Sequence, residues 1–299
     1  FVMGMVGQGR ASVLNSRITG RRFGMFVNGD DNSLVTIKNS SFKTAKSTFC
    51  VKGSATIFDV ENTVMEAGNG TIVQLMDTDE CGMNVQKFFI PVGEMDTALP
   101  ERDLTAASET EDVIFRLKGC RIKGNFFNST TNIRAYQRVE RGSMGEFHDD
   151  LIGIIGKQTF TEDSDGDTYG SSIEERHHGD DLRGPKNLGL ELTGTTIEGI
   201  ISSASQKYRD GLTVITEANR MDMSNVTQAA APTVNNGVVV SLDGESAWIV
   251  TGTSYLTSLT LAPGAEVRAA NGGKLTMTVD GVETPIQAGR YQGKIVLTA

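Results

Sequence analysis

One stretch of the sequence has the residue types and the spacing of a calcium-binding loop. Asp163, Asp165 and Asp167 stand at alternate positions, and Glu174 is the twelfth residue counted from Asp163. Ca²⁺ takes about six to eight hard oxygen ligands, which carboxylates at such intervals supply. The sixth position, where a loop of this kind turns sharply at a glycine, is Thr168, and the flanking sequence does not predict helices. Two interpretations remain: a Ca²⁺ site of these four carboxylates, and an acidic loop exposed to solvent.

The histidines of the chain all lie in the same acidic segment: His148, His177 and His178. Adjacent side chains of a strand point to opposite faces, which disfavours one metal ion bound by both His177 and His178. Exposed histidines in a polar loop are therefore favoured over a transition-metal site.

Catalysis of glycoside cleavage would need carboxylates that converge to act as acid and base. The residues of the second acidic segment that would form such a cleft are Asp163, Asp167, Asp180, Asp181, Arg176 and Arg183. The outward positions of the predicted strands are mostly Ser, Thr, Lys and Asn, for example Thr36 and Lys118, so the sequence predicts carboxylates confined to loops. Nothing in their spacing makes them converge. The chain also lacks a nucleotide-binding glycine loop, a Gly-x-Ser-x-Gly motif and a Cys/His zinc pair.

The charge distribution separates two acidic segments from a mildly basic remainder. The 299 residues carry a net charge of −9, which argues against nonspecific binding to nucleic acid. Residues 77–112 contribute −8 and residues 136–186 contribute −6, so the rest of the chain is at +5. No apolar run approaches the roughly 18–20 residues of a membrane helix, and we expect no membrane insertion.

The three cysteines, Cys50, Cys81 and Cys120, are not spaced as metal ligands. Buried thiols are favoured over one disulfide with a free thiol, and neither interpretation decides the redox compartment.

Apolar residues two positions apart recur around an Asn or Gly anchor. The anchors are Asn15, Asn39, Asn62, Gly119, Gly194 and Gly252. Residues four and two before each anchor and three after it are apolar, as are Phe115, Leu117 and Ile122 around Gly119. Residues one and five after each anchor are small. A spacing of two is typical of a strand, and Asn and Gly adopt left-handed backbone conformations at low cost. The pattern predicts a strand, a tight corner and a second strand.

Successive anchors differ in residue number by 24, 23, 57, 75 and 58, and removing the two acidic segments reduces 57 to 21 and 75 to 24. This indicates an all-β, single-stranded right-handed parallel β-helix of about seven to nine turns, stacked at about 4.8 Å. We expect one domain over residues 1–299, with insertions at about 77–112, 136–186 and 209–243 on one edge and a C-terminal cap over 271–299. Asp280-Gly281 predicts a hairpin turn within that cap. The alternative is chance alternation in a β-sandwich.

The run Trp248-Ile-Val-Thr-Gly252-Thr-Ser254-Tyr-Leu256-Thr-Ser-Leu259-Thr-Leu261 resembles a phrase of autotransporter-type passengers and related bacterial surface β-helix adhesins. The match is good over Val238–Val267. The resemblance implies a parallel β-helix at the bacterial cell surface or outside the cell. It leaves the activity open, because this fold carries adhesins, polysaccharide lyases and inert stalks. Trp248, aligned with Leu190, is interpreted as a core residue.

Three functions follow from these observations. The first is a binding or structural module, adhesin- or matrix-like, whose acidic loops recognise a carbohydrate or a cell-surface protein. The second is a carbohydrate-active enzyme with its site under the same loops. The third is a subunit that self-associates through the β-helix ends, with Phe1–Gly9 as the joining segment. Calcium is the only cofactor that the residues indicate, and no nucleic-acid partner is expected.

Overall fold

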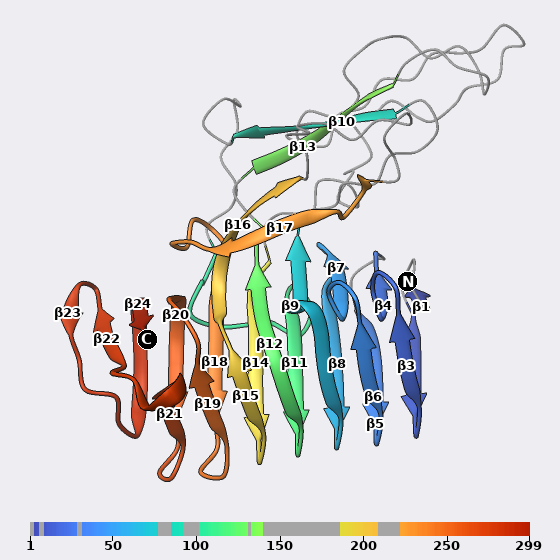
Figure 1. Cartoon of the computed structure of the whole chain (residues 1–299). Coiled ribbons are helices and arrows are strands. Elements are labelled where there is room, and N and C mark those ends of the chain that lie inside the picture. Colours follow the sequence, from blue (N-terminus) through green and yellow to red (C-terminus); the bar gives the residue numbers. More distant parts are fainter. Residues whose placement is uncertain are drawn as a thin grey trace, which may run out of the picture.

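The protein is all-β and is built mainly from parallel strand pairs (Figure 1). A computed structural model of the chain describes residues 3–5, 9–28, 32–76, 85–91, 102–130, 133–139, 186–208 and 222–299. Within these ranges the one complete helical element is the short 3-10 helix Ala270–Gly272. None of the described helices is long and apolar enough to cross a membrane.

The first of two large sheets has ten strands, seven of them parallel. Its strands in spatial order are β2 (Arg10–Leu14), β5 (Ser33–Lys38), β8 (Thr56–Glu61), β11 (Val113–Lys118), β14 (Leu188–Thr193), β18 (Val238–Leu242), β20 (Ser254–Leu261), β24 (Gly289–Thr298), β22 (Thr276–Val279) and β23 (Val282–Glu283). The last three strands are antiparallel to their neighbours. Asp280 and Gly281 both have positive φ between β22 and β23, which confirms the predicted hairpin turn.

The second sheet has twelve strands, and the strands of its main path also lie side by side in the order in which they occur in the chain. Its main path is β1 (Met3–Met5), β4 (Met25–Val27), β7 (Phe49–Lys52), β9 (Val64–Met76), β12 (Arg121–Asn128), β15 (Thr196–Gly199), β19 (Ala247–Val250) and β21 (Glu266–Ala269). Beside this path lie β3 (Arg17–Gly20), β6 (Ser41–Thr44), β16 (Ile201–Tyr208) and β17 (Val226–Ala230). A separate antiparallel pair joins β10 (Val85–Pro91) to β13 (Ile133–Val139).

The corners between the two sheets are the ones that the anchors predict. Asn15, Asn39 and Asn62 have φ of 50°, 49° and 48°, and Gly119 and Gly194 have φ of 62° and 54°. The three asparagines form a ladder in which each amide nitrogen donates to the amide oxygen of the preceding one, at 3.2 and 3.3 Å. A side chain at Gly119 would approach Asn62 Oδ1 to 2.7 Å, so a glycine follows the ladder. The corner prediction is confirmed for these five anchors.

After Asn15, Asn39 and Gly119 the small residue is linked to the next corner by a hydrogen bond. The backbone N–H of Ser16 donates to Ser40 Oγ (3.1 Å), and that of Ser40 donates to Thr63 Oγ1 (3.4 Å). Further along, Cys120 N–H donates to Thr195 Oγ1 (3.1 Å). A hydroxyl here accepts a backbone proton that would otherwise be buried unpaired, which explains why the position is small and polar.

The predicted alignment of the sixth repeat copy, anchored at Gly252, is wrong. Leu190 pairs with Val240, whereas Trp248 pairs with Ile197 on the next strand. The corner between β18 and β19 is one residue longer than the corner before it, because Leu192 pairs with Leu242 but Thr196 with Ala247. The Gly252 phrase is therefore shifted relative to the earlier copies. As a consequence Val238–Leu242, placed in the third insertion (209–243), is a strand of the ten-stranded sheet. Trp248 is nevertheless fully buried, as the core interpretation requires.

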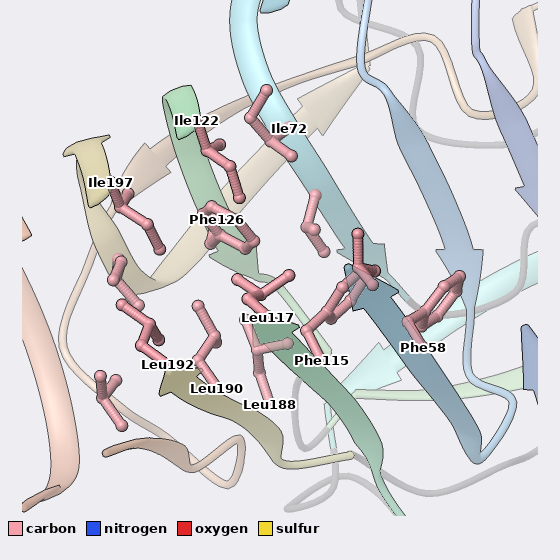
Figure 2. Packing of buried hydrophobic residues seen from close by; sticks show 14 of the residues in the cluster. Phe58, Ile72, Phe115, Leu117, Ile122, Phe126, Leu188, Leu190, Leu192 and Ile197 are labelled. Atoms are coloured by element: carbon pink, nitrogen blue, oxygen red, sulfur yellow. The ribbon is translucent and has the colours of Figure 1, made fainter. Parts of the chain in front are cut away.

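The space between the two sheets is filled by one apolar core. Figure 2 shows Phe58, Phe115 and Phe126 beside the aliphatic side chains of neighbouring strands. The rings of Phe58 and Phe115 stack with their centroids 4.2 Å apart, and Phe49 meets Phe115 edge-on at 5.4 Å. Cys50 and Cys120 are buried thiols outside any disulfide, as predicted, and burial raises the pKa of Cys120. Cys81 lies outside the described residues.

Candidate functional site

The residues predicted for calcium, Asp163, Asp165, Asp167 and Glu174, lie outside the described residues. So do the three histidines and the other residues of the predicted catalytic cleft, which are Arg176, Asp180, Asp181 and Arg183. In the part of the chain that the structure describes, no group of three His, Cys, Asp or Glu side chains is arranged to hold a metal ion. The calcium site therefore stays a prediction.

The structure brings the start points of the insertions together at one end of the strands. Leu75, near the end of β9, pairs with Asn128 at the end of β12, and Asn128 pairs with Ser203 in β16. The chain returns at three neighbouring strand starts, since Val113 pairs with Leu188 and Leu188 pairs with Val238. We call these strand ends and starts the insertion platform.

Buried amide side chains hold the insertion platform together. Asn128 Nδ2 donates to the carbonyls of Lys186 (2.7 Å) and Gly237 (3.1 Å), and Asn236 Nδ2 donates back to the Asn128 carbonyl (2.8 Å). Asn187 Nδ2 donates to the carbonyls of Asp103 and Ala106 at 2.8 and 2.7 Å. Each of these amides thus joins segments that are far apart in the sequence, and such networks rigidify the structure around them.

Asp112 closes the network where the first insertion returns. Its Oδ1 accepts the Asn187 backbone N–H at 2.7 Å, its Oδ2 accepts the Ser108 N–H at 2.9 Å, and Arg102 forms an ion pair with it. The Asp112 side chain is only 2% exposed. A buried carboxylate with a cationic partner and backbone donors fixes this segment against the sheet.

Replacing Asn128 with alanine is expected to lower the free energy of unfolding by about 2–4 kcal/mol. The variant removes one of two donors from each of the buried Lys186 and Gly237 carbonyls, at about 0.5–1.5 kcal/mol per hydrogen bond. It also leaves the buried Thr130 N–H without its acceptor, Asn128 Oδ1, and an unsatisfied buried group costs about 1–3 kcal/mol. The control is Gln287→Ala, at an exposed amide with no side-chain hydrogen bond in the described structure, which should change stability by less than about 0.5 kcal/mol. Urea unfolding followed by circular dichroism measures both, and equal losses would contradict the platform.

The third insertion returns across the N-terminal strands before it reaches β17. Gln74 Nε2 on β9 donates to the Ser224 carbonyl (3.0 Å), Arg22 donates to the Met223 carbonyl, and Lys46 donates to Asn225 Oδ1. β17 then pairs antiparallel with β16, and Figure 1 shows this hairpin lying across the strand ends. The segment ties the N-terminal strands to the insertion platform.

Carboxylates also line the outer face of the ten-stranded sheet, which corrects the prediction that they are confined to loops. Asp59 pairs with Arg116, and Arg116 pairs with Glu191, in one row across three strands. Arg116 forms ion pairs with Asp59 (3.7 Å) and Glu191 (3.3 Å), and a third with Glu109. The sequence missed this row because the strands that carry it are separated by long insertions.

A second row on this face alternates in charge. Glu61 forms ion pairs with Lys38 (3.1 Å) and Lys118 (3.3 Å). Hydrogen bonds from Lys38 and then Lys118 lower the pKa of the Glu61 carboxyl below its usual value, with the positive charges adding to the effect. Two other carboxyl groups also have a lowered pKa because they accept hydrogen bonds. Asp103 accepts them from Thr105, and Asp243 accepts chiefly from the Ser246 hydroxyl.

The lowered pKa of Glu61 predicts a pH-dependent difference between the protein and a Glu61→Gln variant. A folded-state pKa below the unfolded value, about 4.5, stabilises the fold above that value. The stabilisation is lost as the pH falls through the folded pKa. Thermal unfolding from about pH 2.5 to 7 should therefore show a lower Tm for the variant at neutral pH and equal Tm values in acid. Glu283→Gln, at an exposed carboxylate with no ion pair in the described structure, is the control; a gap that persists in acid would contradict the cause.

An apolar pocket of about 550 Å³ adjoins the insertion platform at its C-terminal side. Its walls come from the returning insertions (Leu104, Pro232, Val234) and from β20 and β24 (Tyr255, Val296). The volume lies in the range of small-molecule sites, about 300–1,000 Å³, and the lining suits an apolar group. Sequence patterns gave no signal for it, because five segments that lie far apart in the sequence form it.

The described residues can therefore present charged rows, an apolar pocket and a rigid base for long insertions. Comparisons of the chain with protein-family models, with curated proteins and with solved structures find no match.

Proposed function

We propose that the chain is a single-stranded right-handed parallel β-helix that acts at the bacterial cell surface or outside the cell as a binding or structural module, adhesin- or matrix-like. The observation that carries this proposal is the insertion platform: three long insertions start from neighbouring strand ends and return at neighbouring strand starts. A rigid scaffold that displays long loops along one edge is a common arrangement for recognition.

The β-helix is supported by the order of strands in the two sheets. Strands of the first sheet alternate along the chain with strands of the second, and equivalent positions such as Val35, Phe58 and Phe115 are direct neighbours. This is what turns of a coil produce when each stacks on the one before. Parallel connections in one sheet are right-handed in about 98% of cases, which supports the proposed hand.

Binding is favoured over catalysis by the state of the carboxylates. A general acid for glycoside cleavage needs a raised pKa, whereas each described carboxyl group with a shifted pKa (Glu61, Asp103 and Asp243) has it lowered. Those on the ten-stranded face are held by lysine and arginine. The charges are thus arranged for pairing between strands.

One observation favours the second candidate, a carbohydrate-active enzyme. Asp59, Glu109 and Glu191 surround Arg116, so three carboxylates and a basic residue share one surface. All three contact the same guanidinium and are 42%, 61% and 52% exposed, which makes an ion-pair cluster the better interpretation. The experiment that tests the function also separates these two candidates.

A glycan array combined with a polysaccharide-degradation screen, each with and without Ca²⁺, tests the proposal. Binding without released product supports the module, and product release supports the enzyme. The matched variant replaces residues 131–185 with a short glycine-rich turn, because Thr130 and Lys186 already exchange hydrogen bonds at 3.0 Å. We expect this variant to fold and to lose recognition by the second acidic segment. Absence of binding to glycans and to bacterial or host cell surfaces would overturn the binding role.

A further inference from the structure

The outer face of the twelve-stranded sheet carries cations that have no ion-pair partner among the described residues. Arg17 on β3, Lys43 on β6 and Arg121 on β12 are exposed, and none forms an ion pair or side-chain hydrogen bond within the described ranges. Lys123 lies beside Arg121 on the same face and is paired with Glu198 at 3.2 Å. We call these four residues the basic face.

The strand register places the basic face in two adjacent rows. Arg17 and Arg121 belong to one row, three strands apart, which corresponds to about 14 Å. Lys43 and Lys123 belong to the next row, two strands apart, or about 10 Å. Positive charges therefore recur at intervals along the direction in which the strands stack.

A shallow groove runs over the same strands. It has a volume of about 470 Å³ and is lined by Val64, Arg121, Lys123, Thr196, Glu198 and Ile249. Val64, which is 53% exposed, lies beside Arg121 in the first row, whereas Glu66 lies between Lys43 and Lys123 in the second. The groove thus offers charged, hydroxyl and aliphatic contacts in one line.

The middle strands of the ten-stranded sheet provide a contrast with the basic face, although Arg10 on β2 and Arg290 on β24 also form no ion pair within the described ranges. On the ten-stranded face Lys38, Lys118 and Arg116 are all engaged by carboxylates. On the basic face three of the four cations, Arg17, Lys43 and Arg121, form no ion pair within the described ranges, although the whole chain is at −9. An anionic partner would gain the interactions that the protein itself does not supply.

We propose that the basic face binds an extended acidic polysaccharide along the stacking direction of the strands. This rests on the proposed surface-binding function and adds a recognition surface outside the acidic insertions. A sugar chain with anionic groups at intervals matches cations about 10–14 Å apart, and its hydroxyls match Thr196 and the carboxylates of the groove. Duplex DNA, with one charge per about 1.7 Å, would bring phosphates against Glu66 and Glu198.

The test uses the full chain with polygalacturonate and heparin as probes, and dextran and a 20-base-pair DNA duplex as comparisons. Isothermal titration calorimetry at about 50 and 150 mM NaCl should show binding to an acidic polysaccharide that weakens with salt. A Lys43→Glu/Arg121→Glu variant should bind at least about tenfold more weakly. The matched control, Lys274→Glu/Arg290→Glu, makes the same change in net charge at exposed cap residues and should bind within about twofold of the parent.

Three outcomes would overturn the proposal: no binding to either acidic polysaccharide at the lower salt, equal losses in both variants, or equal affinity for the DNA duplex. Unchanged circular dichroism and Tm of the variants exclude unfolding as the cause. Failure here, with binding on the glycan array retained, rejects only the basic face. Failure of both experiments rejects the binding function as well.

Discussion

Replacing Trp248 with alanine is expected to lower the free energy of unfolding by about 3–5 kcal/mol. Trp248 is fully buried between Ile197 and Val267, its partners on the adjacent strands. Its indole Nε1 donates to the Gly199 carbonyl at 2.9 Å, so truncation opens a cavity and also leaves that acceptor without its donor. Urea unfolding monitored by far-UV circular dichroism gives the difference.

Two controls separate the contributions at this position. Trp248→Phe keeps most of the volume and removes the hydrogen bond, so we expect a smaller loss, about 1–3 kcal/mol. Tyr255→Ala removes an aromatic ring that is only half-buried and should cost less than Trp248→Ala. An equal cost for Trp248→Ala and Tyr255→Ala would contradict the corrected register, in which only Trp248 faces the core.

The second large effect is expected from Phe115→Ala, also about 3–5 kcal/mol. The Phe115 ring is fully buried, stacks on Phe58 and meets Phe49 and Phe126 edge-on at 5.4 and 6.1 Å. Phe58 and Phe115 lie on neighbouring strands although the whole first insertion separates them in the sequence. Stability at this contact therefore depends on the first insertion starting and ending in register.

A double-mutant cycle tests that dependence. Phe58→Ala and Phe115→Ala should be coupled by about 0.5–1.5 kcal/mol, the value typical of stacked aromatic pairs. Phe115→Leu, which keeps an apolar side chain, should lose less than Phe115→Ala. Additive losses from the two alanine substitutions would mean that the rings do not touch, and the register across the first insertion would be wrong.

The corners of the fold could be predicted from the sequence because their chemistry is local. Asn39 and Gly119 mark a backbone conformation that few residues adopt, and apolar neighbours at a spacing of two mark the strands beside it. The last copy failed because its spacing changes: the next pairs, such as Val240 with Leu259, lie closer together in the sequence than the earlier pairs. The residues around Gly252 resemble the earlier copies in sequence, but they begin on β19, one strand after β18, which is the true equivalent of the earlier strands.

The candidate site was largely hidden from the sequence because it depends on contacts between distant segments. Asn128 stands in a polar Asn-Ser-Thr run, and nothing in that pattern predicts that its side chain is buried and bonded to Gly237. The row of Asp59, Arg116 and Glu191 appears only once the register across two insertions is known. The basic face could be anticipated only as the excess positive charge outside the acidic segments.

The most direct test of the stacked scaffold is a distance between two positions on its outer face. Thr36 and Thr260 are connected by five successive in-register steps through Asp59, Arg116, Glu191 and Ser241, which corresponds to about 24 Å. Spin labels at Thr36→Cys and Thr260→Cys, with Cys50, Cys81 and Cys120 replaced, allow electron–electron double resonance to measure it. The predicted result is a narrow distribution centred at about 24 Å, the sum of five strand spacings. A broad distribution, or one centred beyond about 40 Å, would contradict the stacking of parallel strands across all three insertions.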